Sequence, residues 1–217
     1  MAKGYLLEDV AKTAEIFLQD KILKFLLIIR KKTKTENIVF SGGLFLNVAL
    51  NGAIVKKNIF KKIFFNLAPS DNGLSLGAIS YYLLNKKKKN FKINKYGLSP
   101  YLGPSFSKND TIKTLNKFDL KYEIPKQLHF DIAKNISLGK IIGVFDGRAE
   151  YGQRSLGNRS ILADPRSKIS KYRLNLFLKK RDWFMPFAPA ILDKDFDSWF
   201  PNQHKSYYMQ VTNEIKN

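Results

Sequence analysis

The chain has 217 residues, of which 44% are hydrophobic, and it contains two histidines and no cysteine. This length and apolar content suffice for a packed core, and the lack of cysteine excludes disulfide scaffolds, thiolate metal sites and thiol nucleophiles. Since His129 and His204 lie far apart in the sequence, zinc enzymes and Ser-His-Asp hydrolases are disfavoured as well. We see no secretion signal and no apolar run near the roughly 20 residues of a membrane span, so we expect a soluble, cytoplasmic protein.

Positive charge dominates the chain, whose formal net charge is +20 at pH 7. Of the 38 basic residues, 31 are lysines spread along the chain, which is typical of a default surface residue, and the lysine run at 86–89 indicates a solvated linker. The seven arginines differ, because six of them fall within the 34 residues from Arg148 to Arg181. A planar guanidinium can bind a phosphate or carboxylate through two parallel hydrogen bonds, so this cluster predicts an oxyanion site.

The first part of the sequence predicts an α/β arrangement. Helical spacing of apolar residues, short apolar strands and turns that contain glycine or aspartate alternate along it. In chain order we expect a helix at 6–30, a strand at 38–40, a helix at 46–56, a strand at 63–65, a turn at 69–73 and a helix at 74–84. The loops after the two strands should lie together at the carboxyl ends of the strands, where such sheets bind ligands.

The second part of the sequence is richer in glycine, proline and arginine. We expect irregular structure at 90–110, helices at 111–118 and 131–138, a buried strand at 141–145, a long polar loop at 148–166, a helix at 168–179 and a rigid turn at 186–189. A loop of that length without its own secondary structure is usually functional or disordered. Leu156, Ile161 and Leu162 are spaced through the loop and argue against disorder, which leaves a functional role.

The first candidate site follows the two predicted strands. It consists of Ser41, Gly42, Gly43, Asn47, Asp71 and Gly73. Glycines between a strand and a helix let a ligand approach the backbone, and the N-terminus of the helix favours an anion. Asn47 could hydrogen-bond a sugar or a base, and Asp71 could bind a metal ion. Each of these signals also fits an ordinary tight turn or a helix cap, so both interpretations stay open at this point.

The second candidate site is the arginine-rich stretch. We expect Glu150 and Asp164 to hold its guanidinium groups in position, and each charge-assisted hydrogen bond contributes on the order of 1.5–3 kcal/mol. Two or three arginines held in this way predict a pocket for a small phosphorylated ligand. The members of the site are Arg148, Arg154, Asn158, Arg159 and Ser160, with Lys179 and Arg181 further along the chain.

The same stretch resembles the signature of a known family. Residues 146–166 read DGRAEYGQRSLGNRSILADPR and are followed by Leu174-Asn175, Lys179, Arg181-Asp182-Trp183-Phe184 and Pro186-Phe187-Ala188-Pro189-Ala190. This pattern is similar to that of the carbamoyltransferase family, which includes nodulation-factor and antibiotic O-carbamoyltransferases. Residues 40–47 (FSGGLFLN) and 68–78 (APSDNGLSLGA) resemble the preceding region of that family, in the same order.

The resemblance implies two domains and an activity. Residues 1–90 are expected to form the second half of an actin-like ATPase domain, similar to that of the tRNA threonylcarbamoyl-transfer proteins, and residues 91–217 a truncated YrdC-like α/β domain. In this family, carbamoyl phosphate and ATP yield a carbamoyl-adenylate, and the carbamoyl group then passes to a hydroxyl of a sugar or natural-product acceptor. The complete enzyme would also hold a divalent metal, iron or magnesium.

The resemblance also implies roles for single residues. Arg148, Arg154, Arg159, Lys179 and Arg181 would line the carbamoyl phosphate and ATP site as catalytic residues. Cofactor binding would fall to Asn158 and Ser160 in that site and to Ser41, Gly42, Gly43, Asn47 and Gly73 in the transfer site, with Asp71 as the metal ligand. Met185 replaces an arginine of the family, and Gln153 and Ser155 replace a proline and an alanine.

The family's phosphate-binding segment and histidine pair have no counterpart in this sequence. We therefore expect a separate chain to supply that N-terminal half, no membrane or nucleic-acid partner, and no turnover by this chain alone. Two alternatives stay open: a non-catalytic basic module that binds nucleic acid or another polyanion, and an inactive relic. Aromatic residues rarely alternate with lysine in the manner of a base-stacking platform, which ranks the nucleic-acid alternative lower.

Overall fold

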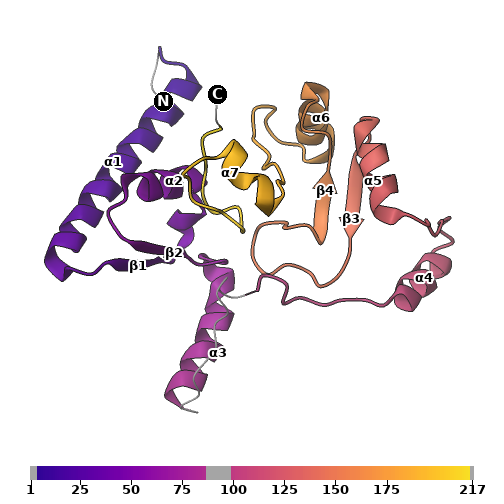
Figure 1. Cartoon of the computed structure of the whole chain (residues 1–217), viewed down its shortest axis with the longest axis horizontal. Coiled ribbons are helices and arrows are strands. Elements are labelled where there is room, and N and C mark those ends of the chain that lie inside the picture. Colours follow the sequence, from indigo (N-terminus) through magenta and orange to yellow (C-terminus); the bar gives the residue numbers. More distant parts are fainter. Residues whose placement is uncertain (1–3, 87–98, 216–217) are drawn as a thin grey trace. The chain divides into compact units, whose positions relative to one another are not determined.

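The computed structural model describes residues 4–86 and 99–215, so most of the lysine run at 86–89 lies outside the described residues. Contacts divide the chain into two compact units, which we call the first unit (Met1–Leu98 with Leu192–Asn217) and the second unit (Ser99–Ile191). Figure 1 shows the elements of both units. The mixed α/β class is confirmed, whereas the actin-like and YrdC-like assignments and the family division at residue 90 stay predictions.

The first unit follows the order expected from the sequence. Its two strands pair in parallel with Phe40 opposite Phe65, so that β1, α2 and β2 form a β-α-β unit. Two short elements near the end of the chain, a 3-10 turn and α7, were not expected. The elements are α1 (Leu7–Thr33), β1 (Asn37–Phe40), η1 (Gly43–Leu46), α2 (Val48–Lys57), β2 (Lys62–Phe65), η2 (Asp71–Gly73), α3 (Leu74–Asn85), η4 (Asp193–Asp195) and α7 (Phe196–Trp199).

The core of the first unit lies between one face of this sheet and helices α1 and α2. Phe40 and Phe65 stack with ring centroids 5.1 Å apart, and Leu26 of α1 and Leu50 and Ile54 of α2 pack onto them. The strands bury alternate residues, as expected for a sheet that is covered on one side. The core therefore fixes where the two strands end, and the loops of the first candidate site begin there.

The end of the chain folds back onto the first unit. The Gln210 side chain donates from Nε2 to the carbonyls of Phe65 and Asn66, at 2.8 and 2.9 Å. In return, the Gln210 carbonyl accepts a hydrogen bond of 2.8 Å from the buried Asn51 amide. These bonds attach the C-terminal segment to the end of β2 and to α2, beside the first candidate site.

The second unit is built around a β-hairpin. Strands β3 and β4 pair antiparallel, with Ile142 opposite Leu162 and Phe145 opposite Arg159, and α5 packs against β3. In Figure 1 the two strands run side by side between α5 and α6. The elements are α4 (Lys108–Lys117), α5 (Leu128–Ser137), β3 (Ile142–Phe145), β4 (Arg159–Leu162), α6 (Lys168–Arg173) and the π-type turn η3 (Leu174–Leu178).

Four expectations for the second unit need correction. The strand at 141–145 was expected to be buried, whereas β3 has no buried residue and Phe145 is 65% exposed. The loop at 148–166 is interrupted by β4, because Ile161 and Leu162 find a partner strand in β3. Helix α4 begins before residue 111, since Ser107 and Asp110 form a capping box that fixes its start. The helix at 168–179 is divided, because the Lys179 N–H bonds five residues back, to the Leu174 carbonyl at 2.8 Å.

We find no helix within residues 4–86 and 99–215 with the length and apolar character needed to cross a membrane.

Candidate functional site

The loops after β1 and β2 are joined, as expected for the carboxyl ends of parallel strands. The Gly42 N–H donates to the Pro69 carbonyl at 2.6 Å, and the Ser41 hydroxyl lies 3.5 Å from the same oxygen. Gly42 has a backbone φ of 106°, which residues that carry a side chain rarely adopt, so the turn out of β1 requires glycine. Gly43 lies beside the Ser70 hydroxyl, where an added Cβ would be 3.7 Å from Oγ.

Gly73 is confined by the backbone of the same loop. A Cβ at this position would lie 2.1 Å from the Ala68 carbonyl oxygen, far inside van der Waals contact. Ala68 is itself buried, so the oxygen cannot retreat into solvent. The turn before α3 therefore depends on glycine for close approach of the backbone rather than for an unusual φ.

Asn47 serves as the N-cap of α2. Its Oδ1 accepts from the N–H groups of Ala49 and Leu50, both at 3.0 Å, and its Nδ2 donates to Glu15 of α1 at 2.8 Å. The helix-cap interpretation of Asn47 is thus confirmed. Contact between Asn47 and a nucleotide stays a prediction, and it would have to use the second N–H group of Nδ2 or break one of these bonds.

Asp71 is exposed at the start of η2. Across residues 4–86 and 99–215, no group of three or more histidine, aspartate or glutamate side chains is arranged to hold a metal ion. Within the described part of the chain, Asp71 therefore has no two further carboxylate or imidazole groups beside it. A role for Asp71 as one ligand of a metal stays a prediction.

In the second unit, the backbone after Pro100 is fastened to the turn that follows β3. The Gly103 N–H bonds to the Ala149 carbonyl at 2.9 Å, and the Ala149 N–H bonds to Pro104 at 3.0 Å. Arg148 strengthens this attachment, because its Nε and Nη2 donate to the carbonyls of Gly103 and Leu102, each at 3.0 Å. We call residues 100–104 the strap.

The Arg159 side chain is held more completely than that of Arg148. Its guanidinium stacks on Phe145 at 3.7 Å from the ring centroid and donates four hydrogen bonds to backbone carbonyls. An arginine has five N–H donors, so Arg159 retains one and Arg148 retains three. The four acceptors are the carbonyls of Asp146 (2.6 Å), Asn158 (2.9 Å), Gly147 (3.3 Å) and Pro104 (3.4 Å).

Glu150 organises the loop between the two strands. Its Oε1 accepts from the N–H groups of Leu156, Asn158 and Arg159, at 2.8, 2.8 and 3.2 Å. Partial burial tends to raise the pKa of this carboxyl, but the backbone N–H groups together outweigh it and lower the pKa. We expected Glu150 to hold guanidinium groups, whereas within the described chain it holds the loop backbone.

Asn158 and Ser160 close the same loop. The Asn158 Nδ2 donates to the Arg148 carbonyl at 2.7 Å, and the Asn158 carbonyl accepts from the Asp146 N–H at 3.0 Å. The Ser160 hydroxyl accepts from the Gly157 N–H at 2.9 Å. Both predicted ligand-binding residues thus have structural bonds within the loop, and the bond of Asn158 holds the backbone of Arg148.

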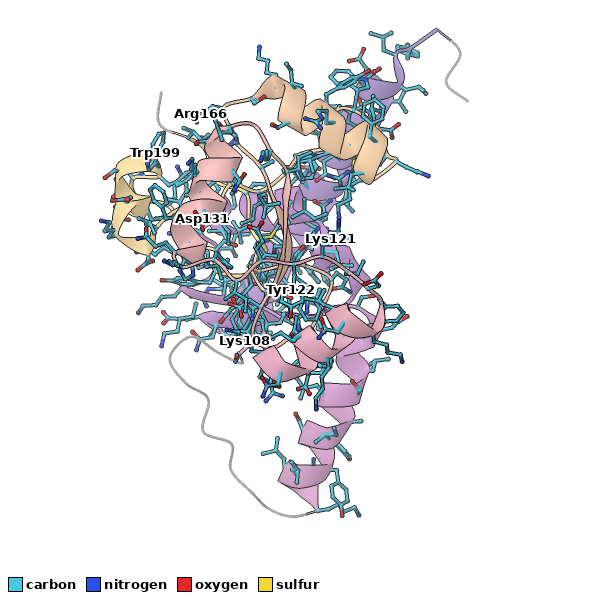
Figure 2. The ribbon with its side chains drawn as sticks, turned by 90° about the vertical axis from the view of Figure 1, so that its right-hand side faces the viewer. Lys108, Lys121, Tyr122, Asp131, Arg166 and Trp199 are labelled. Carbon is cyan, nitrogen blue, oxygen red and sulfur yellow. The ribbon has the colours of Figure 1, made fainter. Side chains whose placement is uncertain are left out.

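Asp164 does hold an arginine, as expected. Its carboxylate receives Nε and Nη2 of Arg166 and also the Arg166 backbone N–H, with contacts of 2.7–3.1 Å. These hydrogen bonds lower the pKa of Asp164 to about 2 and raise that of Arg166. Asp164 is only 8% exposed, so its ion pair with Arg166 fixes the turn after β4. Arg166 is labelled in Figure 2.

Arg181 belongs to a second arginine cluster, which forms after α6. The fully buried Asn175 donates to the carbonyls of Trp183 and Met185 and accepts from Arg181 Nε at 2.7 Å. Arg181 also stacks on Phe187, 4.6 Å from the ring centroid, and donates to Pro186 at 3.4 Å. Two of its five N–H donors are used in this way, which leaves three.

The structure brings only some of the predicted residues together. Arg148, Asn158, Arg159 and Ser160 share the β3–β4 hairpin and the strap, and Arg154 lies half-buried in the same loop. Arg181 instead donates to Asn175 and Pro186 in its own cluster, and Lys179 is exposed. A shallow hollow lined by residues 120–123, in the segment that connects α4 to α5, includes none of the predicted residues; Lys121 and Tyr122 of this segment are labelled in Figure 2.

The strap and Asn175 are the parts of the site that residue patterns did not single out. The strap was expected only as irregular structure. Its glycine at position 103 was a sequence signal of close packing, and the structure gives the reason, because an added Cβ there would lie 2.7 Å from the Ala149 Cβ. Asn175 was noted only as part of a motif. Its burial at the start of a π-type turn follows from packing that no periodicity reveals.

Comparison with known proteins identifies the family. The family model described as carbamoyltransferase N-terminus matches residues 1–80, and the one described as carbamoyltransferase C-terminus matches residues 133–217. An uncharacterised protein of Methanocaldococcus jannaschii is 32% identical over 96% of this chain and 35% of its own length. Nodulation protein NolO of Bradyrhizobium diazoefficiens is 33% identical over 88% of this chain and 35% of its own.

A relative with a named activity is also similar. The 3'-hydroxymethylcephem-O-carbamoyltransferase of Streptomyces clavuligerus is 26% identical over 95% of this chain and 39% of its own length. The chain therefore spans a little more than a third of the relatives that it matches. With both terminal family models matched in order, the chain belongs to the carbamoyltransferase family.

Proposed function

We propose that the chain is part of an O-carbamoyltransferase. The complete enzyme would use carbamoyl phosphate and ATP to form a carbamoyl-adenylate and would transfer the carbamoyl group to a hydroxyl of a sugar or natural-product acceptor. Family membership supports the reaction class, and the named activity of the cephem relative supports a hydroxyl acceptor. The contribution of this chain would be to bind and orient the phosphorylated substrates.

Arg148 carries this proposal. The strap carbonyls and the Asn158 side chain fix its position, yet three of its N–H donors have no acceptor among the described residues. A preorganised cation with unused donors is suited to a phosphate or acyl phosphate, whose charge shifts during the reaction. Arg181 has the same character in its own cluster, because three of its donors are also unused.

The two arginines of the hairpin would have different roles. Arg148 would contact substrate, whereas Arg159, with four donors on the backbone, would position the loop that carries Arg148. In the first unit, the joined loops at Gly42 and Gly73 would approach the nucleotide of the transfer step. The divalent metal would take Asp71 as one ligand and its other ligands from groups beyond the described residues, because these supply no cluster of three.

Calorimetric titration of the chain with carbamoyl phosphate and with ATP tests the proposal. One lost charge-assisted hydrogen bond is worth about 1.5–3 kcal/mol, so we expect Arg148→Ala to weaken binding by roughly 10- to 100-fold. Arg173→Ala is the matched control, since Arg173 is exposed at the end of α6, and it should leave the affinity unchanged. Equal affinities of the wild type and Arg148→Ala, or no binding of either substrate, would reject the proposal.

Turnover would require the rest of the enzyme. We propose that a separate chain supplies the N-terminal half, since the relatives are about three times as long as the aligned region. The chain alone should then bind substrates without transferring a carbamoyl group to a hydroxyl acceptor. Mass spectrometry of acceptor mixtures incubated with and without the added half would measure this difference.

A further inference from the structure

One face of the β1–β2 sheet is uncovered. Val39 and Phe64 lie opposite each other in the parallel register and point away from the core, and their exposed fractions are 69% and 43%. Parallel strands are almost always buried on both faces, because crossover helices cover them. Helices α1 and α2 cover the other face, so the exposed face lacks its layer.

Helix α3 is also uncovered. It follows β2 after η2 and carries no buried residue, although most of its side chains are apolar. A helix that is hydrophobic all round is normally buried in a protein core. In Figure 1, α3 extends away from β1 and β2. Its large exposed side chains are Leu74 (70%), Ile79 (57%), Tyr81 (69%), Tyr82 (51%) and Leu84 (49%).

We infer that these two features form a docking surface for a carbamoyltransferase segment that lies outside residues 1–217. We call Val39, Phe64 and the large apolar residues of α3 the docking surface. The length of the relatives supports this occupant, because each has nearly two thirds of its chain beyond the aligned region. The N-terminal family model covers both strands and the first half of α3, so the surface lies in a region that the relatives share.

A second copy of this chain is a less suitable occupant. It would bring a second uncovered sheet face and a second apolar helix, and it would leave the missing length of the relatives unexplained. A segment from the rest of the family fold would add the absent layer. This inference rests on the proposed function, because it takes the missing half to be the carbamoyltransferase half.

Co-expression tests the inference. The full chain is produced together with the part of the Methanocaldococcus jannaschii relative outside the aligned 214 residues, and complexes are measured by size exclusion with light scattering. We expect a one-to-one complex whose affinity falls at least tenfold in Val39→Lys and in Tyr81→Lys. Ile169→Lys is the matched control, because Ile169 is 70% exposed in the second unit, and it should bind as the wild type does.

Several results would overturn the inference. These are the absence of a complex, equal binding by all variants, and a dimer of the chain alone that Val39→Lys dissociates. The inference would also be wrong if Val39→Lys, but not Ile169→Lys, lowered the unfolding midpoint of the isolated chain. That result would mean that the second unit already covers the outer face of the β1–β2 sheet. Titration of Val39→Lys with carbamoyl phosphate separates the two proposals, because the docking variant should retain the affinity that Arg148→Ala loses.

Discussion

At the scale of single residues, the pair of Asp164 and Arg166 makes stability depend on pH. The pKa of Asp164 is about 2 in the folded chain, against an ordinary value of 3.8, because Arg166 donates to its carboxylate. Because the pKa of Asp164 is lower in the folded chain than in the unfolded chain, its contribution to the free energy of unfolding is fully present above about pH 4 and is lost as the pH falls toward 2. We expect the stability difference between the wild type and Asp164→Asn to shrink across that window in urea titrations.

A matched variant checks this prediction. Asp20 pairs with Lys24 four residues along the exposed surface of α1, at 2.8 Å. Exposed pairs of this kind contribute little, so Asp20→Asn should change the stability much less than Asp164→Asn at neutral pH. A difference between wild type and Asp164→Asn that stays constant from pH 6 to pH 2 would contradict the assigned ion pair.

Gly73 allows a second prediction at this scale. Gly73→Ala forces a methyl group against the buried Ala68 carbonyl, so we expect a loss of about 1–3 kcal/mol in the free energy of unfolding. Gly77 lies within α3 with open space around it, and Gly77→Ala should instead be neutral or stabilise by about 1 kcal/mol. Urea titrations of both variants measure the contrast, and equal stabilities would show that the turn is not confined.

At the scale of secondary-structure elements, Asn47 links the start of α2 to α1. Asn47→Ala removes the N-cap and the bond to Glu15, which should destabilise the chain by about 1 kcal/mol. Asn47→Ser keeps a cap oxygen but cannot reach Glu15 in the same way, so it should recover most of the loss. If both variants lose equal stability in thermal unfolding, the bond to α1 rather than the cap is the dominant contribution.

The elements of the first unit could be predicted from local patterns. Continuous helical spacing gave α1, and short apolar runs flanked by turns gave β1 and β2 within one residue of their ends. Strand β4 could not be predicted in this way, because Arg159 and Ser160 are polar and only pairing with β3 makes this segment a strand. The return of Gln210 to the end of β2 is equally a tertiary effect.

The sequence predicted which residues belong to the candidate site, but not how their side chains are bonded. The clustering of arginine pointed to the hairpin, and the glycines pointed to the joined loops after the strands. Local sequence does not show which donors are already used, and this distinguishes Arg148 from Arg159. Arg148 uses its donors on carbonyls of the strap, which lie about 45 residues earlier in the chain, whereas Arg159 uses one on the strap and three on carbonyls of its own hairpin.

At the scale of the whole molecule, the net charge of +20 predicts weak, non-specific attraction to polyanions. Counterion release makes such binding fall steeply with salt, by about 10³–10⁵ between 50 and 200 mM for 6–10 phosphate contacts. We expect the anisotropy of labelled DNA of arbitrary sequence to show little binding at physiological salt. Tight binding that persists there would favour the basic-module alternative over an enzyme part.

The strap also limits how the protein can be dissected. The C-terminal family model starts at residue 133, which would suggest cutting the gene near that codon to obtain a smaller piece. Such a cut would discard the carbonyls of Leu102 and Gly103, which are the two acceptors of the Arg148 side chain, and that of Pro104, which is one of the four acceptors of Arg159. A subcloned C-terminal piece should therefore begin ahead of Pro100 if its arginines are to keep their native orientation.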